Sequence, residues 1–541
     1  MVLQRVKKHA KAAVVLFFLF VLLVGMLTVD DYGNGWDDLG EMNILRMALK
    51  EYAVLIPANT SYSDALERME HIPRISESDE RDHGICMYYP LFWAVTNDAL
   101  SLRQQTVIWR LYTWAIFVLG LWALYAIGLH LGFSRLLCCV GVVIMLCSPR
   151  FFAEGHYNNK DIALMTAVLV LFWQAVRLME KPDWKRGLGF VVAAGFCAGT
   201  RVIGIAYCCL FGLMVILHLR ATSQLNRRSI LLGVMVLMGS FLMYAFLTPS
   251  FLADPPEFLA YCLRNAVGFS RWGNSTLFVG RMYHGPSTHP PRIYLPVMIV
   301  VTTPLWILLL LATGVILLLK RFAVYPKIVL ENRSFLVALT ALLAWVCPAL
   351  ACFVARPLLY NGWRHMYFLY GPMVLCAMRG LAQLWEACKT RRNRQRVLAA
   401  ALSGCMLFTG VGIAVNHPYQ YGYFNLLVPV ENRASLFDMD WWNLSCMDAI
   451  NELLESTQGE VYITASDGSS MSGLESAKRY LEEDRLVVVQ DREQAQYVLS
   501  NLSYAALAGF EADERMVPVV SLDSYGSSMM VIYAIEGGEA Q

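Results

Sequence analysis

The sequence predicts a mainly α polytopic membrane protein that carries a small α/β domain at its C-terminal end. The chain has 541 residues, of which 57% are hydrophobic and only 16% charged, whereas soluble domains carry about 25% charged residues. Its apolar residues gather in runs of roughly 18 or more, which is long enough to cross a bilayer as a helix. After about residue 440 these runs stop, and short strand and helix patterns alternate instead.

The apolar runs define about eleven membrane spans. The first run is long and no small-x-small cleavage site follows it, which favours an uncleaved membrane helix over a signal peptide. Segment 188–219 must hold two short helices that meet near Arg201, an arrangement that is tolerated where broken spans line a polar cavity. The expected spans are 12–28, 106–129, 135–148, 162–178, 188–201, 203–219, 230–249, 293–319, 334–354, 366–386 and 397–415.

The links between these spans sort by charge onto two sides. One side receives the basic links, and the positive-inside rule places that side, with the N-terminus, in the cytoplasm. The basic links contain Arg5, Lys7, Lys8, Arg135, Lys181, Lys185, Arg186, Arg220, Arg227, Arg228, Lys320, Arg321, Lys327 and the run 389–396. The extracytoplasmic side then receives segments 29–105, 149–161, 250–292 and 355–365 and everything after about residue 416.

Two domains follow from this arrangement. Residues 1–425 form the transmembrane domain, with large external loops at 29–105 and 250–292, and residues 440–541 form an extracytoplasmic α/β domain. In the first loop, apolar residues recur at helical spacing and predict an amphipathic surface helix over 37–53. The apolar positions of that helix are Met42, Leu45, Ala48, Leu49 and Tyr52. The α/β domain has expected strands at 460–464, 486–490, 496–500 and 529–535 and expected helices at 446–456 and 472–483.

Five carboxylates follow the first span: Asp30, Asp31, Asp37, Asp38 and Glu41. The first two are interpreted as residues that solvate the end of the span. The other three fall in the first turn of the expected surface helix, where the helix dipole favours negative charge. Helix capping therefore remains open as the role of Glu41, beside a role in chemistry.

Two further polar clusters lie in external links. Residues 149–161 contain Arg150, Glu154, His156, Lys160 and Asp161 at the mouth of a span, where ionisable groups are costly unless they pair or face water. A solvated hairpin is the alternative interpretation. The other cluster is 356–365, with Arg364 and His365.

Arg201, at the break between two short helices, requires an anion, either a carboxylate of the protein or the phosphate of a ligand. Carboxylates suit general-base work on a hydroxyl, and arginines suit a phosphate leaving group. A substrate that is both phosphorylated and resident in the membrane would be a lipid phosphate. The net charge of +2 gives no indication of nucleic-acid binding. The chain also has no P-loop, HExxH or CxxC motif.

Three motifs together resemble the C-type integral-membrane glycosyltransferase (GT-C) superfamily, and within it the bacterial branch related to protein O-mannosyltransferases and aminoarabinose transferases. They are Gly-Trp-Asp-Asp at 35–38, Ser-Pro-Arg-Phe at 148–151 with Asn-Asn-Lys-Asp at 158–161, and Tyr-Asn-Gly-Trp-Arg-His at 360–365. Weaker similarities lie at 199–201, 294–304 and 417–425, in the order that the family shows. The resemblance spans about residues 12–445 and implies a GT-C-like bundle in a bacterial inner membrane.

The resemblance implies a transferase that moves a sugar from a polyprenyl-phosphate-linked donor to a hydroxyl acceptor on the outer face of the membrane. Asp37, with Asp38 beside it, would be the general base, and Asp161 would position the acceptor, a metal ion or the base. Arg201, Arg364 and His365 would hold the donor phosphate. Secondary contacts would come from His156, Lys160 and Arg150.

The chain departs from the family pattern at three positions. Asp38 replaces a Glu and keeps the carboxylate, Asn159 replaces a Pro, and Asn361 replaces an Asp, so position 361 receives no catalytic role. The use of a divalent cation is left open; Asp37, His156 and Asp161 would form the candidate oxygen and nitrogen site. A disulfide among Cys86, Cys262 and Cys446 is left open as well.

The partners that these observations imply are a sugar donor, the bilayer, and an acceptor on a glycan, a lipid or a protein. The alternative from another class is a transporter or flippase for a lipid-linked glycan. Transporters commonly show internal repeats and charges near the bilayer midplane, whereas this sequence shows no repeat and collects its ionisable groups at one face. A membrane scaffold is a third interpretation, but it leaves the polar clusters unexplained.

Overall fold

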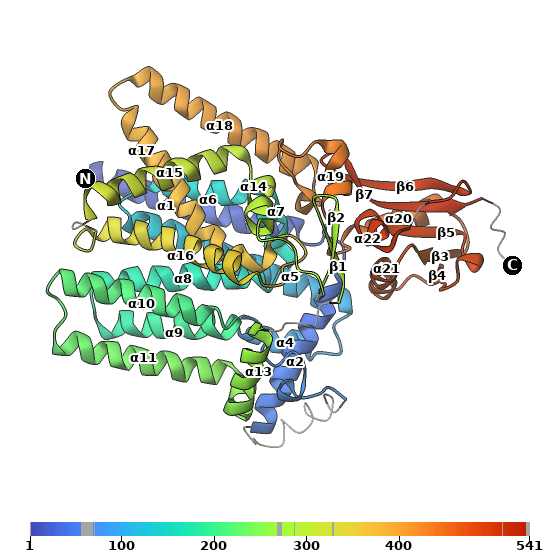
Figure 1. Ribbon diagram of the computed structural model, residues 1–541, viewed down its shortest axis with the longest axis horizontal. Helices are drawn as coiled ribbons and strands as arrows, with labels where there is room; N and C mark the ends of the chain where they lie inside the picture. The colour runs from blue at the N-terminus through green and yellow to red at the C-terminus, as the bar shows by residue number, and fades with distance from the viewer. Residues whose placement is uncertain are drawn as a thin grey trace.

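The computed structural model describes residues 2–55, 69, 71–267, 273–285, 287–326, 329–510 and 512–536. Eight helices are long and apolar enough to cross a membrane, so the polytopic, mainly α class is confirmed and the chain is an integral membrane protein. These helices are α1 (Val2–Thr28), α5 (Leu102–His130), α8 (Asp161–Glu180), α10 (Gly204–Ala221), α11 (Arg227–Leu247), α15 (Leu305–Val324), α16 (Arg333–Ala355) and α18 (Arg392–Val415). Most of them run side by side along one axis (Figure 1).

A proline lies at the end of one expected span and interrupts another. The span expected at 135–148 is α6 (Arg135–Leu146), after which the chain bends by 78° into α7 (Pro149–Tyr157). The span expected at 293–319 divides into α14 (Tyr294–Thr302) and α15, because Thr303 is extended before Pro304. A residue before proline is disfavoured in the helical region, and proline has no amide hydrogen to continue a helix. A single straight span was therefore the wrong prediction at 293–319, whereas the expected span 135–148 corresponds to α6 and ends before the bend at Pro149.

Two further expected spans are shorter than the others. Segment 188–219 does hold two helices, since α9 (Trp184–Thr200) ends before Arg201 and α10 begins at Gly204. Segment 366–386 consists of the 3-10 turn η4 (Arg364–Leu369) and the helix α17 (Tyr370–Ala387). Neither α9 nor α17 is by itself long and apolar enough to be counted as a membrane span among the described residues.

The amphipathic helix expected at 37–53 is confirmed as α2 (Trp36–Leu55). Its apolar face packs on protein: Met42, Leu45 and Ala48 are fully buried in a cluster that includes residues of α5. The short elements around it and in the other loops are η1 (Ile75–Glu77), η2 (Cys86–Leu91), α4 (Phe92–Val95), α12 (Pro249–Ala253), α13 (Pro255–Val267), η5 (Gln420–Gly422), η6 (Val430–Asn432) and α19 (Arg433–Leu436).

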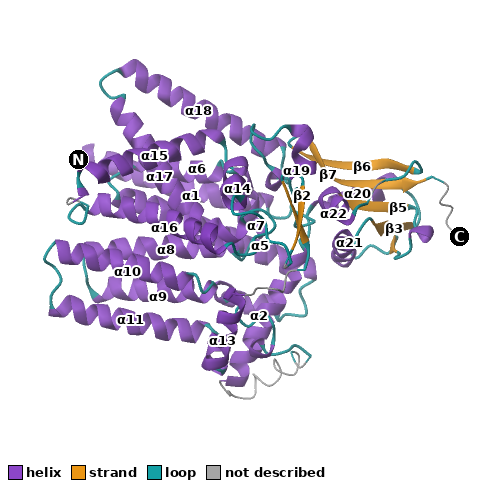
Figure 2. Cartoon of the chain, viewed as in Figure 1, coloured by secondary structure: helices purple, strands orange, loops and turns teal. Residues whose placement is uncertain are grey.

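The C-terminal segment forms a five-stranded mixed sheet with helices on it (Figure 2). The strand order is β4-β3-β5-β7-β6; β3 pairs in parallel with β4 and β5, and β7 pairs antiparallel with β5 and β6. The elements are α20 (Ser445–Ser456), β3 (Val461–Ala465), α21 (Gly468–Leu481), β4 (Leu486–Val488), η7 (Arg492–Gln494), β5 (Tyr497–Asn501), α22 (Leu502–Ala508), β6 (Met516–Ser524) and β7 (Ser527–Ile535). The expected small α/β unit is therefore present.

Three strands were not expected from the sequence. The edge strand β6 contains Pro518, which argues against a central strand but is tolerated at an edge. The other two form a hairpin in the 250–292 loop, β1 (Ser275–Phe278) and β2 (Arg281–His284). Phe278 of this hairpin makes an isolated bridge to Phe437, so the loop contacts the segment that leads into the C-terminal sheet.

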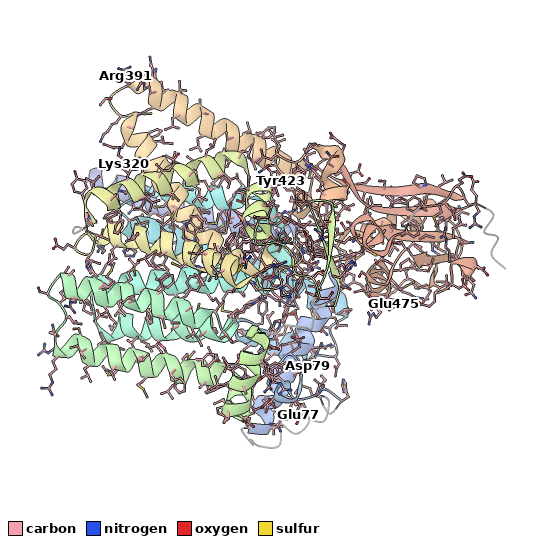
Figure 3. The ribbon with its side chains drawn as sticks, viewed as in Figure 1. Glu77, Asp79, Lys320, Arg391, Tyr423 and Glu475 are labelled. Carbon is pink, nitrogen blue, oxygen red and sulfur yellow. The ribbon has the colours of Figure 1, made fainter. Side chains whose placement is uncertain are left out.

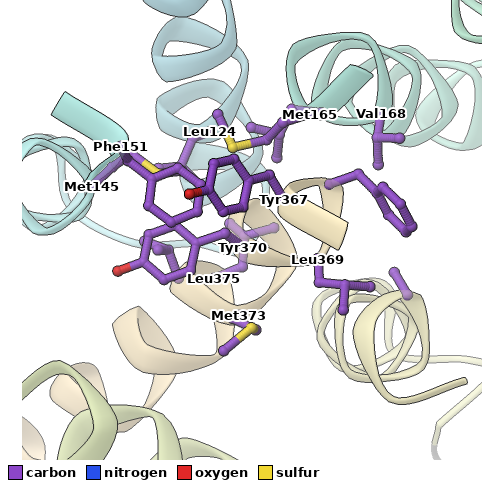
Figure 4. Packing of buried hydrophobic residues seen from close by; sticks show 14 of the residues in the cluster. Leu124, Met145, Phe151, Met165, Val168, Tyr367, Leu369, Tyr370, Met373 and Leu375 are labelled. Atoms are coloured by element: carbon purple, nitrogen blue, oxygen red, sulfur yellow. The ribbon is translucent and has the colours of Figure 1, made fainter. Parts of the chain in front are cut away.

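A continuous apolar core holds the bundle together next to the polar segments. Figure 4 shows Phe151 of α7 against Tyr367 and Tyr370, with Met145 and Met165 close by. The rings of Phe151 and Tyr370 are stacked, with centroids 4.0 Å apart. This packing fixes α7 against η4, and both elements supply residues to the site described below.

The labelled side chains locate the two ends of the bundle. Lys320 and Arg391 lie at the end that also holds the N-terminus, whereas Asp79, Tyr423 and Glu475 lie toward the other end (Figure 3). We call these the basic end and the domain end, since the C-terminal sheet sits on the latter. By the positive-inside rule, we expect the basic end to face the cytoplasm.

Candidate active site

Four segments that are far apart in sequence meet at the domain end. They are the first turn of α2, the turn between α7 and α8, the residue after α9, and the start of η4. Each lies where a helix begins or ends, so each presents polar groups without interrupting a membrane helix. The predicted residues Asp37, Lys160, Asp161, Arg201 and Arg364 come from these segments.

Asp37 lies between two cations. Its Oδ2 atom is 3.3 Å from Nζ of Lys160 and 3.6 Å from Nη1 of Arg364. The side chain of Asp37 remains 31% exposed, while those of Lys160 and Arg364 are largely buried. Asp37 is therefore a carboxylate that is held in place yet open to an incoming group.

Glu41, one turn further along α2, is completely enclosed. Its Oε1 lies 2.5 Å from Nζ of Lys160, and its Oε2 lies 3.2 Å from Nε2 of His83 and accepts a hydrogen bond from Asn159. Burial acts to raise the pKa of Glu41, but His83 and Lys160 outweigh burial and hold that pKa well below its ordinary value. Burial likewise acts to lower the pKa of Lys160, and Asp37 and Glu41 raise it. Glu41 thus fixes Lys160 as an ammonium beside Asp37.

Asp38 is directed into a different contact. Its Oδ2 lies 2.6 Å from Nη2 of Arg110, and both side chains are buried. Arg110 also donates to the backbone oxygens of Tyr32 and Gly33. Burial raises the pKa of Asp38, with Arg110 acting in the opposite direction. This ion pair anchors the chain between α1 and α2 to α5.

Asp161 and Arg201 form a further ion pair of the site. Oδ1 of Asp161 lies 2.9 Å from Nη2 of Arg201, whose side chain is 30% exposed. Asn158 donates to Oδ2 of Asp161 and to Glu154, and Tyr367 donates to the other oxygen of Glu154. The anion that Arg201 requires is therefore supplied by the protein, and part of the Arg201 side chain stays accessible.

The cations converge around His365. Burial acts to lower the pKa of Arg364, but Asp37 and Asp161 outweigh it and raise that pKa. Burial lowers the pKa of His365 well below its ordinary value, and Arg364, Arg201 and Lys160 lower it further. His365 is thus a neutral imidazole beside three positive charges. Its Nδ1 is buried without a hydrogen-bond partner among the described residues.

Two arginines lie under tryptophans from the segment that leads into the C-terminal sheet. The guanidinium of Arg364 is 4.5 Å from the ring centre of Trp442, and that of Arg150 is 4.8 Å from the ring centre of Trp441. Arg150 donates from Nε to the backbone oxygen of Tyr423, and both of its terminal nitrogens lack a partner among the described residues. These aromatic contacts are cation–π interactions, which use the face of each guanidinium and not its N–H groups.

Unpaired buried donors are concentrated in this region. Buried polar groups normally have partners, so a group of unpaired ones marks a place that can hold a ligand. In the described part of the chain, such atoms include both terminal nitrogens of Arg150, Nε of Arg364, Nε1 of Trp441 and Trp442, and the hydroxyl of Tyr157. Most of these groups are donors, which suits a phosphate or a hydroxyl-rich ligand.

The candidate metal site is not assembled. His156 uses Nε2 toward the Thr28 hydroxyl and Nδ1 toward the backbone oxygen of Phe152, and its ring stacks on Trp114. Across the described residues, no three His, Cys, Asp or Glu side chains form a group that could hold a metal ion. The set of Asp37, His156 and Asp161 therefore does not fit a metal. Cys86, Cys262 and Cys446 are all free thiols.

The structure thus brings most of the predicted residues together, although their roles remain predictions. Asp37, Lys160, Asp161, Arg201, Arg364 and His365 are connected by ion pairs and by shared electrostatics. Arg150 lies under Trp441, Asp38 is bound to Arg110, and His156 belongs to an aromatic cluster. The sequence left Glu41 open between helix capping and chemistry and did not include it among the site residues, although its spacing of four from Asp37 places both on one helix face.

Comparisons with known proteins give a likeness to a solved structure. No protein-family model matches the chain, and no curated protein sequence matches it. The chain is similar to the crystal structure of ArnT from Cupriavidus metallidurans bound to undecaprenyl phosphate, with a TM-score of 0.41 and 14% identity, over 97% of this chain and 98% of that one.

Proposed function

We propose that the protein is a membrane glycosyltransferase that moves a sugar from a polyprenyl-phosphate-linked donor to a hydroxyl acceptor at the domain end. The observation that carries this proposal is the position of Asp37, a half-buried carboxylate between Lys160 and Arg364. A base next to phosphate-binding cations is the arrangement that such a transfer needs. By the charge of its loops, this end faces the extracytoplasmic side.

The reaction would proceed as a direct displacement at the sugar. Asp37 removes the proton of the acceptor hydroxyl as the oxygen attacks the anomeric carbon, and the bond from that carbon to the phosphate oxygen breaks. The polyprenyl phosphate leaves with the electron pair of the broken bond. Arg364 and the accessible part of Arg201 would neutralise the growing phosphate charge, because guanidinium groups match phosphate geometry.

The neighbouring residues would hold this arrangement in place. Glu41 and His83 fix Lys160, and Asp161 fixes Arg201. The acceptor would be a hydroxyl of a glycan, a lipid or a protein. Undecaprenyl phosphate, the lipid bound in the ArnT structure, belongs to the proposed class of carrier and is the first carrier to test.

The test compares Asp37→Asn with Asp30→Asn in reconstituted full-length protein supplied with a polyprenyl-phosphate sugar and cell-envelope acceptors. Asp30 is a matched control, since it is an exposed carboxylate that pairs with Arg103 away from the site. We expect Asp37→Asn to lower the transfer rate by about 100-fold or more, as loss of a general base does, and Asp30→Asn to retain it. Equal rates for both variants would contradict the role of Asp37.

A transporter or flippase is the alternative that the same assay distinguishes. Labelled lipid-linked sugar that crosses the vesicle membrane without forming a product would support transport and overturn the transferase. Covalent transfer of the labelled sugar to an acceptor, with no movement of the labelled lipid across the vesicle membrane, would support the enzyme.

A further inference from the structure

A cavity separate from the proposed active site opens at the domain end of α16. It has a volume of about 940 Å³, and strand β2, the loop that follows it and the last residues of α16 line it. This volume is in the range of small-molecule sites. None of the residues that line it belongs to the cluster around Asp37.

The wall of this cavity is basic. Arg281, Arg292 and Arg356 line it together with His284 and His289. Segments 279–293 and 352–365 contain no Asp or Glu, and none of the three arginines has an ion pair with a carboxylate among the described residues. Three uncompensated guanidinium groups around one cavity favour an anionic ligand.

The basic wall is held in a fixed shape. Arg356, at the end of α16, adopts a left-handed conformation with φ of 50°. It donates from Nε to the backbone oxygen of Pro290 and from Nη2 to that of His289, and Nδ1 of His289 lies 3.0 Å from the oxygen of Arg356. These bonds tie the loop after β2 to the end of the membrane helix, so the cavity exists before a ligand binds.

The rim of the cavity faces the surface that lipid tails would cover. Val354, which lines the cavity, is 66% exposed, and Leu350 one turn earlier on α16 is 59% exposed. Ile293, next to Arg292, is 54% exposed. Exposed apolar residues at the end of a membrane-spanning helix are suited to acyl chains, and arginines at that level are suited to lipid headgroups.

We infer that this cavity binds the phosphate headgroup of an anionic membrane lipid, with the acyl chains lying along the end of α16. The guanidinium groups of Arg281 and Arg292 contact the phosphate, while Arg356 shapes the wall. This lipid site shares no lining residue with the cluster around Asp37.

Native mass spectrometry of the detergent-solubilised full-length protein tests the inference. Phosphatidylglycerol and phosphatidylcholine with the same acyl chains are titrated onto the wild type, onto Arg281→Ala/Arg292→Ala, and onto the charge-retaining Arg281→Lys/Arg292→Lys. We expect the wild type to prefer phosphatidylglycerol. The alanine variant should lose about fivefold in affinity for each arginine removed, and the lysine variant should recover most of that loss.

The matched control is Arg227→Ala/Arg228→Ala, which removes two exposed arginines from the basic end. It should bind phosphatidylglycerol like the wild type. An equal loss in this control, equal binding of phosphatidylcholine, or wild-type binding by the alanine variant would each overturn the inference. So would displacement of the lipid by millimolar inorganic phosphate, which would make the site one for a soluble anion. The thermal midpoint of each variant is measured alongside, so that a loss of fold is recognised as such.

Discussion

At the scale of single residues, two carboxylates on one face of α2 have different surroundings. Asp37 keeps about a third of its side chain exposed, whereas Glu41 is enclosed by Lys160, His83 and Asn159. A buried acid that is held ionised by two cations is suited to positioning, and an accessible one is suited to proton transfer. We therefore predict that Glu41 is a positioning residue that acts through Lys160.

The variant Glu41→Gln tests this positioning role. Removing the charge leaves Lys160 with Asp37 as its remaining carboxylate partner, so we expect a loss of about 1–3 kcal/mol in the free energy of unfolding. We also expect a reduced transfer rate, because Lys160 then draws closer to the base. Unfolding is followed by intrinsic fluorescence in detergent, and sugar transfer is measured with the same preparation. A variant with unchanged stability and unchanged rate would contradict the role.

The sequence predicted the site residues that lie next to apolar runs, because a polar residue at the end of a membrane helix stands out from the apolar residues beside it. Asp37, Lys160, Arg201 and Arg364 were found in this way. The partners His83 and Arg110 were not, because a contact between positions 41 and 83 has no periodicity in the sequence and depends on how the loop folds. His156 was included by its position in a motif, although its burial against Trp114 could not be anticipated.

At the scale of elements, hairpin β1–β2 is joined to the segment before the C-terminal sheet by a buried carboxyl group. The backbone N–H of Leu277 donates to Oδ1 of Asp438 over 3.1 Å. Burial raises the pKa of Asp438 to about 7, against the opposing effects of that hydrogen bond and of Arg150. When a carboxyl group has a higher pKa in the folded state than in the unfolded state, the folded protein is more stable with that group protonated than with it ionised.

The sign of this shift predicts a pH dependence of stability. The unfolded chain releases the Asp438 proton near pH 4, and the folded chain releases it near pH 7. Stability from this group is therefore present at low pH and is lost as the pH rises from about 4 to 7. We expect the thermal midpoint of the wild type to fall over this interval more than that of Asp438→Asn, which keeps an acceptor oxygen for Leu277. Parallel curves for the two proteins would contradict the assignment.

At the scale of the whole molecule, the C-terminal sheet and the bundle share the candidate active site. Trp441 and Trp442 lie between them in sequence, and their rings cover Arg150 and Arg364. Tyr504, in the sheet domain, donates to the backbone oxygen of Trp441. The C-terminal domain therefore helps to hold in place the two tryptophan rings that lie over Arg150 and Arg364.

The variants Trp442→Ala and Trp442→Phe test whether the contact between the Trp442 ring and Arg364 contributes to donor binding. A cation–π contact with a buried arginine contributes about 0.5–2 kcal/mol, so removal of the ring should raise KM for the donor by about 2- to 30-fold. Phenylalanine retains an aromatic face over Arg364 and should recover part of the loss, whereas a mere packing defect would lower kcat and thermal stability in both variants. Steady-state transfer kinetics at varied donor concentration distinguish the two outcomes. An unchanged KM in Trp442→Ala would show that the C-terminal domain does not contribute to the donor site through this ring.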